Sequence, residues 1–359
     1  EVPKWVLLRL KDGKQSFYAG KNTESPYILL DRATAAAPPV AENEAAALLD
    51  IGDDVLCLEF RSKGNAISAQ TIEMIDIAVE EMARGRAGLV IGNQGAHFSF
   101  GADLSLILEK IDRKAWDELA AEVTLLQDAA SALKYAPKPV VSAAFGMTLG
   151  GGAEIAMQSR ANVFSVATCM GLVETGVGLV PGGGGCKEML AGITARATGA
   201  SKAELLPAVK ELWRNIAGAK VSANAFDAVK KGFAKPDTRI VMNPDRLIDE
   251  AKSKALELSK PDYMPPATQG VLVLGDFGYG ALMIELEAMR GGGFVSEYDA
   301  HIARRLAYIL TGGDAVSVSS VSESYLRELE KEVFLSLCGE EKTRLRIEHM
   351  LKTGKPLRN

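Results

Sequence analysis

Short apolar runs that alternate with helical segments constrain the fold of this chain more than any other feature of the sequence. The runs Val55–Phe60, Ala87–Gly92 and Val140–Ala144 are almost wholly apolar, which is typical of strands buried on both faces of a sheet. Apolar residues recur at steps of three and four over Thr71–Arg84, and a further helix is expected around Leu126–Leu133. Strands that alternate with helices predict an α/β fold built in layers.

The two ends of the chain differ from this middle part. Residues 1–49 contain a possible short helix, Trp5–Tyr18, followed by a run rich in alanine and proline, and we interpret them as a tail or linker. Towards the other end, His301–Leu310 and Glu323–Cys338 each carry an apolar stripe at helical spacing. The prediction is a tail or linker at 1–49, an α/β domain at 50–262 and a helical region at 263–359.

Composition excludes several classes of protein. The 359 residues carry a net charge of −5, without the basic footprint of a nucleic-acid-binding protein. The longest apolar runs are shorter than the ~18 residues that span a bilayer. The cysteines form no CxxC pair and the histidines lack helical ligand spacing, so we expect no metal site. We expect a cytoplasmic protein with no nucleic-acid partner and no membrane insertion, and the start at Glu1 suggests a missing upstream segment.

Glycine-rich segments at 95–103, 145–154 and 170–185 are the candidates for chemistry. They contain neither a phosphate-binding Gly-Lys-Ser/Thr loop nor a GxGxxG turn, so NAD should not bind this chain. The first two follow predicted strands, and each leaves unpaired N–H groups where the next helix starts. Two such amides aimed at one point form an oxyanion hole, and the candidate donors are Ala102 and Gly151.

Two glutamates accompany these turns. Glu154 lies in the first turn of the predicted helix, where the helix dipole favours the charged form. Glu174 lies among apolar and glycine residues, where burial raises the pKa of a carboxyl group and suits it to act as an acid. Taken singly, each has a purely structural alternative: a partner of the helix dipole for Glu154, and a hydrogen-bonded turn residue for Glu174. Their joint presence predicts that both face one cavity.

These motifs, in this order, resemble the crotonase (enoyl-CoA hydratase/isomerase) superfamily over residues 50–262. The resemblance implies a spiral of ββα units. The whole chain also resembles the C-terminal half of a bacterial 3-hydroxyacyl-CoA dehydrogenase fused to a hydratase-like domain, and NAD is then expected only in the missing upstream half. The motifs are Phe98-Ser-Phe-Gly-Ala-Asp103, Leu149-Gly-Gly-Gly-Ala-Glu154, Gly171-Leu-Val-Glu174, Gly178-Leu-Val-Pro-Gly-Gly-Gly-Gly185 and Gly64-Asn-Ala-Ile-Ser68.

The resemblance also implies a role for particular residues. Glu154 and Glu174 match the two catalytic glutamates of hydratases, while Ala102 and Gly151 match the oxyanion donors. CoA is part of the substrate, so no cofactor is expected in this chain, and the implied assembly is a homo-oligomer. Lys63 has the alternative of a solvated surface lysine, and Asp103 that of a helix cap. The expected contacts with the acyl-CoA are Lys63, Asn65, Ala66, Ile67, Gly101, Asp103 and Gly150.

The activity implied is hydration of enoyl-CoA in fatty-acid β-oxidation. Two alternatives stay open. An enoyl-CoA isomerase needs only one glutamate, and a non-catalytic acyl-CoA-binding module needs neither. The presence of both Glu154 and Glu174 favours the hydratase.

Overall fold

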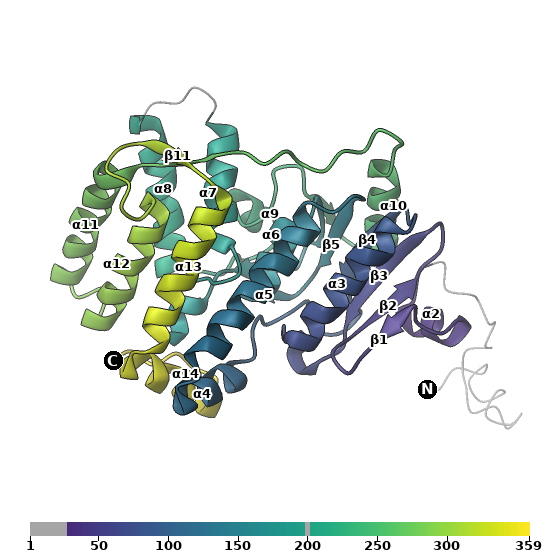
Figure 1. Cartoon of the computed structure of the whole chain (residues 1–359), viewed down its shortest axis with the longest axis horizontal. Coiled ribbons are helices and arrows are strands. Elements are labelled where there is room, and N and C mark those ends of the chain that lie inside the picture. Colours follow the sequence, from purple (N-terminus) through teal and green to yellow (C-terminus); the bar gives the residue numbers. More distant parts are fainter. Residues whose placement is uncertain (1–26, 198–201) are drawn as a thin grey trace, which may run out of the picture.

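The computed structural model describes residues 27–197 and 202–359, and this part of the chain contains a seven-stranded sheet, with α8 (Lys202–Ala217), α11 (Gly275–Gly291), α12 (Glu297–Thr311) and α13 (Glu323–Cys338) grouped to one side of it (Figure 1). The strand order is β1-β2-β3-β4-β5-β7-β9, with parallel pairing from β3 onward and antiparallel pairing of β1, β2 and β3. Its strands are β1 (Ala41–Glu42), β2 (Ala46–Asp50), β3 (Val55–Phe60), β4 (Gly88–Gly92), β5 (Val140–Ala144), β7 (Ala161–Ser165) and β9 (Arg239–Val241).

Helices cover both faces of this sheet. The helix α3 contacts β2, β3 and β4 on one face, and α5 packs against α3. On the opposite face, α10 contacts β4, β5 and β7, and α2 contacts β2. Because both faces are covered, the central strands are mainly apolar, as their sequences predict. These helices are α2 (Leu30–Ala36), α3 (Ala69–Ala83), α5 (Trp116–Lys134) and α10 (Leu247–Leu258).

Two short strand pairs and the remaining helices complete the described fold. Strands β6 and β8 pair in parallel beside the main sheet, and β10 pairs with β11 in antiparallel fashion. The strands are β6 (Met147–Leu149), β8 (Cys169–Gly171), β10 (Val271–Val273) and β11 (Ser319–Val321). The helices are α4 (Leu104–Arg113), α6 (Gly151–Gln158), α7 (Gly185–Arg196), α8 (Lys202–Ala217), α9 (Ala225–Lys230), α11 (Gly275–Gly291), α12 (Glu297–Thr311), α13 (Glu323–Cys338) and α14 (Glu341–Thr353), with 3-10 turns η1 (Lys63–Asn65), η2 (Glu174–Val177) and η3 (Pro244–Arg246).

The predicted tail at 1–49 is wrong in its last residues. Strand β2 pairs with β3 along its whole length, and Leu48 and Leu49 face the two opposite cores of the sheet. Leu30 of α2 is also fully buried. The stretch of alanines and leucines in β2 lacks the β-branched residues that usually signal a strand, which explains the error. The helix expected at Trp5–Tyr18 lies outside the described residues.

The C-terminal region is mainly helical, and its helices pack directly against elements of the α/β part. The helix α13 occupies the predicted segment Glu323–Cys338 and ends at Gly339. It contacts α5 and α7, while α14 contacts α4 and η2 (Figure 1). These contacts bring α13 and α14 against two helices that follow β4 and two elements that follow β8. No helix in the described part of the chain has the length and hydropathy needed to cross a membrane.

Replacement of Leu48 tests whether β2 belongs to the core. Leu48→Ala should lower the free energy of unfolding by about 2–5 kcal/mol, because it leaves a cavity between packed layers. On α10, Leu256 is 38% exposed, so the control Leu256→Ala should change stability by about 0.5 kcal/mol or less. Urea unfolding of both variants measures this. If Leu48→Ala lowered the free energy of unfolding as little as the control does, residues 41–50 would be better described as part of the linker.

Candidate active site

Two glycine turns bring the expected oxyanion donors together. Gly101 has a φ of +89°, and a Cβ there would lie 2.9 Å from the Gly151 nitrogen and 2.9 Å from the Leu149 carbonyl oxygen. A Cβ on Gly151 would in turn lie 3.7 Å from the Ala102 nitrogen. Within the described residues, neither the Ala102 N–H nor the Gly151 N–H donates a hydrogen bond. Two neighbouring amides are thus left available to one acceptor.

Both amides belong to the lining of one cavity of about 540 Å³. Ala102, Gly151, Glu154 and Glu174 all belong to this lining, so the structure brings the two glutamates to one cavity. The rest is mainly apolar and comes from helices far apart in the sequence. Its apolar lining includes Ile107 of α4, Leu119, Val123 and Leu126 of α5, Phe334 of α13 and Met350 of α14.

Glu154 is buried on α6 and held by backbone amides. Its Oε1 accepts hydrogen bonds from the Gly183 and Gly185 N–H groups, each at 2.8 Å. Burial raises the pKa of Glu154, although these two amides and the nearby Lys187 favour the charged form. The effect of burial on the pKa of Glu154 therefore outweighs the opposite effect of the helix dipole that the sequence predicts. Two backbone N–H groups still donate to this carboxylate, while its raised pKa makes it bind a proton more readily than usual. Such a group can serve as a base near neutral pH.

Glu174 begins η2 on the other side of the cavity. Its Oε2 is buried and has no hydrogen-bond partner. A Cβ on Gly150 would lie 3.2 Å from its Oε1, a tight contact, and the φ of +52° at Gly150 also favours glycine there. Burial and then the charge of Glu154 raise the pKa of Glu174 well above its ordinary value. A protonated carboxyl group facing a cavity can act as a general acid.

The turn proposed to contact CoA is only partly at the cavity. Ile67, Asp103 and Gly150 line it, and the Ile67 N–H donates to the Gly101 carbonyl at 2.9 Å. Asp103 caps α4, accepting from the Ser105 N–H at 2.8 Å, which is its structural alternative. The remaining expected contacts stand outside the cavity lining: Lys63 is exposed, the Asn65 side chain donates to the His97 carbonyl, Ala66 accepts from Ser62, and Gly101 lies beneath the two amides.

A third buried carboxylate, Glu330 on α13, was not expected from the sequence. Its Oε2 accepts from the Gly184 N–H at 2.8 Å and its Oε1 from the Lys187 N–H at 2.7 Å. Burial raises the pKa of Glu330 to about 8, and the charge of Glu154 adds to the effect. A signal was present, since Glu330 shares a helical face with Leu326 and Val333, which are both buried.

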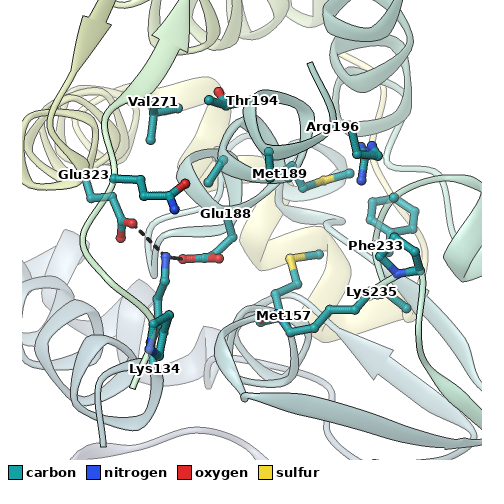
Figure 2. Close-up of a pocket in the computed structure, with 18 of the residues that line it drawn as sticks. Lys134, Met157, Glu188, Met189, Thr194, Arg196, Phe233, Lys235, Val271 and Glu323 are labelled. Carbon is teal, nitrogen blue, oxygen red and sulfur yellow. Dashed lines mark hydrogen bonds and ion pairs between the residues drawn. The ribbon is translucent and has the colours of Figure 1, made fainter. Parts of the chain in front are cut away.

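A buried ion network lies behind this site. The Lys187 ammonium is fully buried and bonds to Gln158 at 2.9 Å, to Glu188 at 2.6 Å and to Glu323 at 3.3 Å. Glu188 and Glu323 also accept from Lys134, at 2.6 and 2.8 Å, and these three residues line a second cavity of about 360 Å³ (Figure 2). The network ties α5, α7 and the start of α13 together.

Comparison with known proteins agrees with this geometry. The family model described as enoyl-CoA hydratase/isomerase matches residues 54–264. A Bacillus subtilis protein named probable 3-hydroxyacyl-CoA dehydrogenase is 39% identical over 374 residues, covering all of this chain and 47% of its own length. A Rickettsia felis protein, named putative fatty acid oxidation complex trifunctional enzyme, is 32% identical over 62% of this chain and 29% of its own length. The chain therefore spans about half the length of the first relative and less of the second.

Solved structures show the same fold. A putative enoyl-CoA hydratase/isomerase from Acinetobacter baumannii superposes with a TM-score of 0.55 at 14% identity, covering 86% of this chain and all of that one. An enoyl-CoA hydratase from Bacillus halodurans gives 0.53 at 15% identity, covering 85% of this chain and 99% of that one. Fold and glycine turns together define a crotonase-type α/β protein. The chain belongs to the enoyl-CoA hydratase/isomerase family. The narrower description of a C-terminal half stays a prediction of the sequence.

The contact between the two glycine turns can be tested at Gly101. Gly101→Ala should destabilise the protein by about 1–3 kcal/mol through backbone strain, and more through the clash with the Gly151 and Leu149 backbone. Gly293 has a φ of +71° but nothing within 4 Å, so Gly293→Ala isolates the strain alone. Thermal unfolding should show the larger loss for Gly101→Ala. Equal losses would mean that the turns do not touch.

The raised pKa of Glu330 predicts a dependence of stability on pH. The folded carboxyl group titrates at about 8 and the unfolded one at 4.5, so the folded state binds more protons between these values. Stability from this group is therefore complete below about pH 4.5 and is lost as pH rises to about 8, at up to roughly 1.4 kcal/mol per unit. Urea unfolding at pH 5 and pH 8 should show wild type losing stability relative to Glu330→Gln. A constant difference would contradict the raised pKa.

Proposed function

We propose that this chain is an enoyl-CoA hydratase of fatty-acid β-oxidation, which adds water to a trans-2-enoyl-CoA to give a 3-hydroxyacyl-CoA. One observation carries the proposal: the buried Glu154 and the partly buried Glu174, whose Oε2 is buried, line the same cavity as two free backbone amides. Hydration needs an acceptor for a proton, a donor for another, and a means of stabilising negative charge on the thioester oxygen. Each requirement has a candidate group at this cavity.

The Ala102 and Gly151 amides would hold the thioester oxygen. As water adds at C3, negative charge develops on that oxygen in an enolate-like transition state. Preorganised amides in a site that excludes water stabilise such charge, and removal of one donor typically costs about 10²–10³-fold in rate. Because the donors are backbone groups fixed by Gly101 and Gly150, they need not move during the reaction.

Glu154 would take the proton from the attacking water, and Glu174 would give a proton to C2. Their environments support this division. Glu154 keeps two amide donors that favour its charged form, whereas the buried Oε2 of Glu174 has none and faces the charge of Glu154. Environments that hold two neighbouring carboxyl groups in different protonation states are what an acid–base pair requires.

The apolar part of the cavity would hold the acyl chain. Its lining by α4, α5, α13 and α14 suits a hydrocarbon tail. The CoA part would reach the turn at Asn65–Ile67, with Lys63 near a phosphate. No cofactor of the chain's own is required. Because the chain spans only 47% of its Bacillus subtilis relative, NAD-dependent dehydrogenase activity would belong to another part of a longer protein.

Isomerisation of a 3-enoyl-CoA to the 2-enoyl form is the second candidate. The family description covers both reactions, and the unpartnered Oε2 of Glu174 could move a proton between two carbons by itself. The two activities separate experimentally. An isomerase converts a 3-enoyl-CoA without needing Glu154, whereas a hydratase consumes crotonyl-CoA and needs both glutamates.

Substitution of each glutamate tests the proposal. Glu154→Gln and Glu174→Gln should each lower turnover of crotonyl-CoA by about 10²–10⁴-fold, since each removes one proton-transfer group. The double variant should lose little more, because the two groups act as a unit. Acyl-CoA affinity should survive, since the oxyanion donors are backbone amides. The loss of enoyl absorbance measures turnover, and calorimetry measures affinity.

Exposed Glu118 provides the control, because its only described ion partner is Arg113 on the surface. Glu118→Gln should leave turnover within about 2-fold of wild type. Near-normal hydration by Glu174→Gln would show that the acid role is wrong and would favour the isomerase. Binding of acyl-CoA without any turnover by wild type would favour a non-catalytic module.

A further inference from the structure

We propose that Glu330, on the C-terminal helix α13, is a positioning residue for Glu154. It would act by fixing the Gly182–Gly185 turn so that the Gly183 and Gly185 amides face the Glu154 carboxylate. The kinetic part of the inference rests on the proposed hydratase function. The structural part does not, because it concerns only how the turn is held.

Two carboxylates share the amides of this one turn. The Gly183 and Gly185 N–H groups donate to Glu154 at 2.8 Å, whereas the Gly184 N–H donates to Glu330 at 2.8 Å. The Lys187 N–H also donates to Glu330, at 2.7 Å. Successive amides thus point to opposite sides, with one carboxylate on each. A shift of the turn at the Glu330 contact would therefore also move the amides that donate to Glu154.

Glu330 also provides the cap that α7 lacks. The residue before this helix is Gly184, whose φ of +101° is left-handed and which has no side chain to accept from the first amides. Those amides are buried, so an acceptor must come from elsewhere in the chain. Glu330 supplies it from 143 residues away along the sequence. Removal of the acceptor would leave two buried N–H groups unsatisfied at the place where Glu154 is held.

Other contacts hold the carbonyl side of the same turn. The Gln127 Nε2 donates to the Gly182 carbonyl at 2.8 Å, and the Gln158 Nε2 donates to the Gly183 carbonyl at 3.1 Å. These bonds fix the turn from α5 and α6 but leave the Gly184 and Lys187 amides to Glu330 alone. Loss of Glu330 is therefore expected to loosen this turn without detaching it.

The charged groups around Glu330 come from several elements. Glu154 of α6 acts on Glu330 with its negative charge, the carboxyl group of Glu174 on η2 interacts electrostatically with Glu330, and Cys186 and Lys187 lie on α7. The Lys187 ammonium is already engaged by Gln158, Glu188 and Glu323. The charge that Glu330 carries once it ionises raises the pKa of Glu174, so Glu330→Gln should also lower the pKa of Glu174, in addition to freeing the turn.

Glu330→Gln tests the inference against a matched variant of the same helix. A glutamine keeps the shape of the side chain, but its amide can accept only one of the two N–H groups and presents a donor to the other. Glu323→Gln also removes a partly buried negative charge from α13, yet Glu323 bonds to the Lys134, Tyr135 and Lys187 side chains and not to the turn amides. The comparison separates the turn contact from the loss of charge.

Two measurements are made on the whole chain. Hydrogen exchange of a peptide covering the Gly182–Lys187 segment should become at least ~10-fold faster in Glu330→Gln and stay near wild type in Glu323→Gln. Crotonyl-CoA turnover should show kcat lower by about 10²-fold in Glu330→Gln with KM within about 3-fold, since a displacement of ~1 Å can cost that much. The decline of kcat at high pH should begin at lower pH.

Unchanged exchange at the turn, or equal changes in both variants, would overturn the inference. If wild type turned over no crotonyl-CoA, the proposed function would fail, and the exchange measurement alone would decide the positioning role. If Glu330→Gln does not fold, Glu330→Asp, which keeps the charge but shortens the reach, should show the same local loss of protection. Failure of both to fold where Glu323→Gln folds would assign Glu330 to global stability and overturn the proposal.

Discussion

The burial of Glu154 depends on the backbone amides of a glycine turn, and the site is built around this contact. A carboxylate removed from water is stable only where charged or polar groups replace its hydration. Here the Gly183 and Gly185 amides do so. A Cβ at Gly183 would lie 2.6 Å from the Glu154 Oε2, so no larger residue allows the turn to come this close. The glycine run in the sequence is therefore a condition for a buried carboxylate.

Close approach of backbones also creates the opposite half of the site. The amides of Ala102 and Gly151 can lie side by side because Gly101 and Gly150 carry no Cβ. A parallel bridge between Ser99 and Thr148 aligns the two segments that lead into these turns. The carboxyl groups of Glu154 and Glu174 thus share a single cavity with two available amides, and this arrangement separates proton transfer from charge stabilisation.

Much of this arrangement could be predicted from the sequence because its signals are local. Apolar runs predicted β3, β4 and β5, and glycines close to glutamates indicated the residues of the candidate site. Strand β2 was not predicted, because a run of alanine and leucine has no periodicity that distinguishes a strand from a linker or a helix. The contributions of Phe334 and Met350 to the cavity escaped for a different reason, since they depend on how α13 and α14 dock.

Glu330 shows most clearly why long-range packing decides function here. In the sequence it stands in a segment rich in charged residues, Glu328 to Glu332, and most such segments are solvated helix faces. The packing of α13 against α7 buries this carboxyl group. Its partners are amides at the start of α7, which have no capping side chain of their own. The C-terminal helices therefore close the apolar pocket and also complete the hydrogen bonding of the turn behind Glu154. A hydratase-like domain that ended before residue 263 would keep both glutamates but would leave the Gly184 and Lys187 amides without their acceptor.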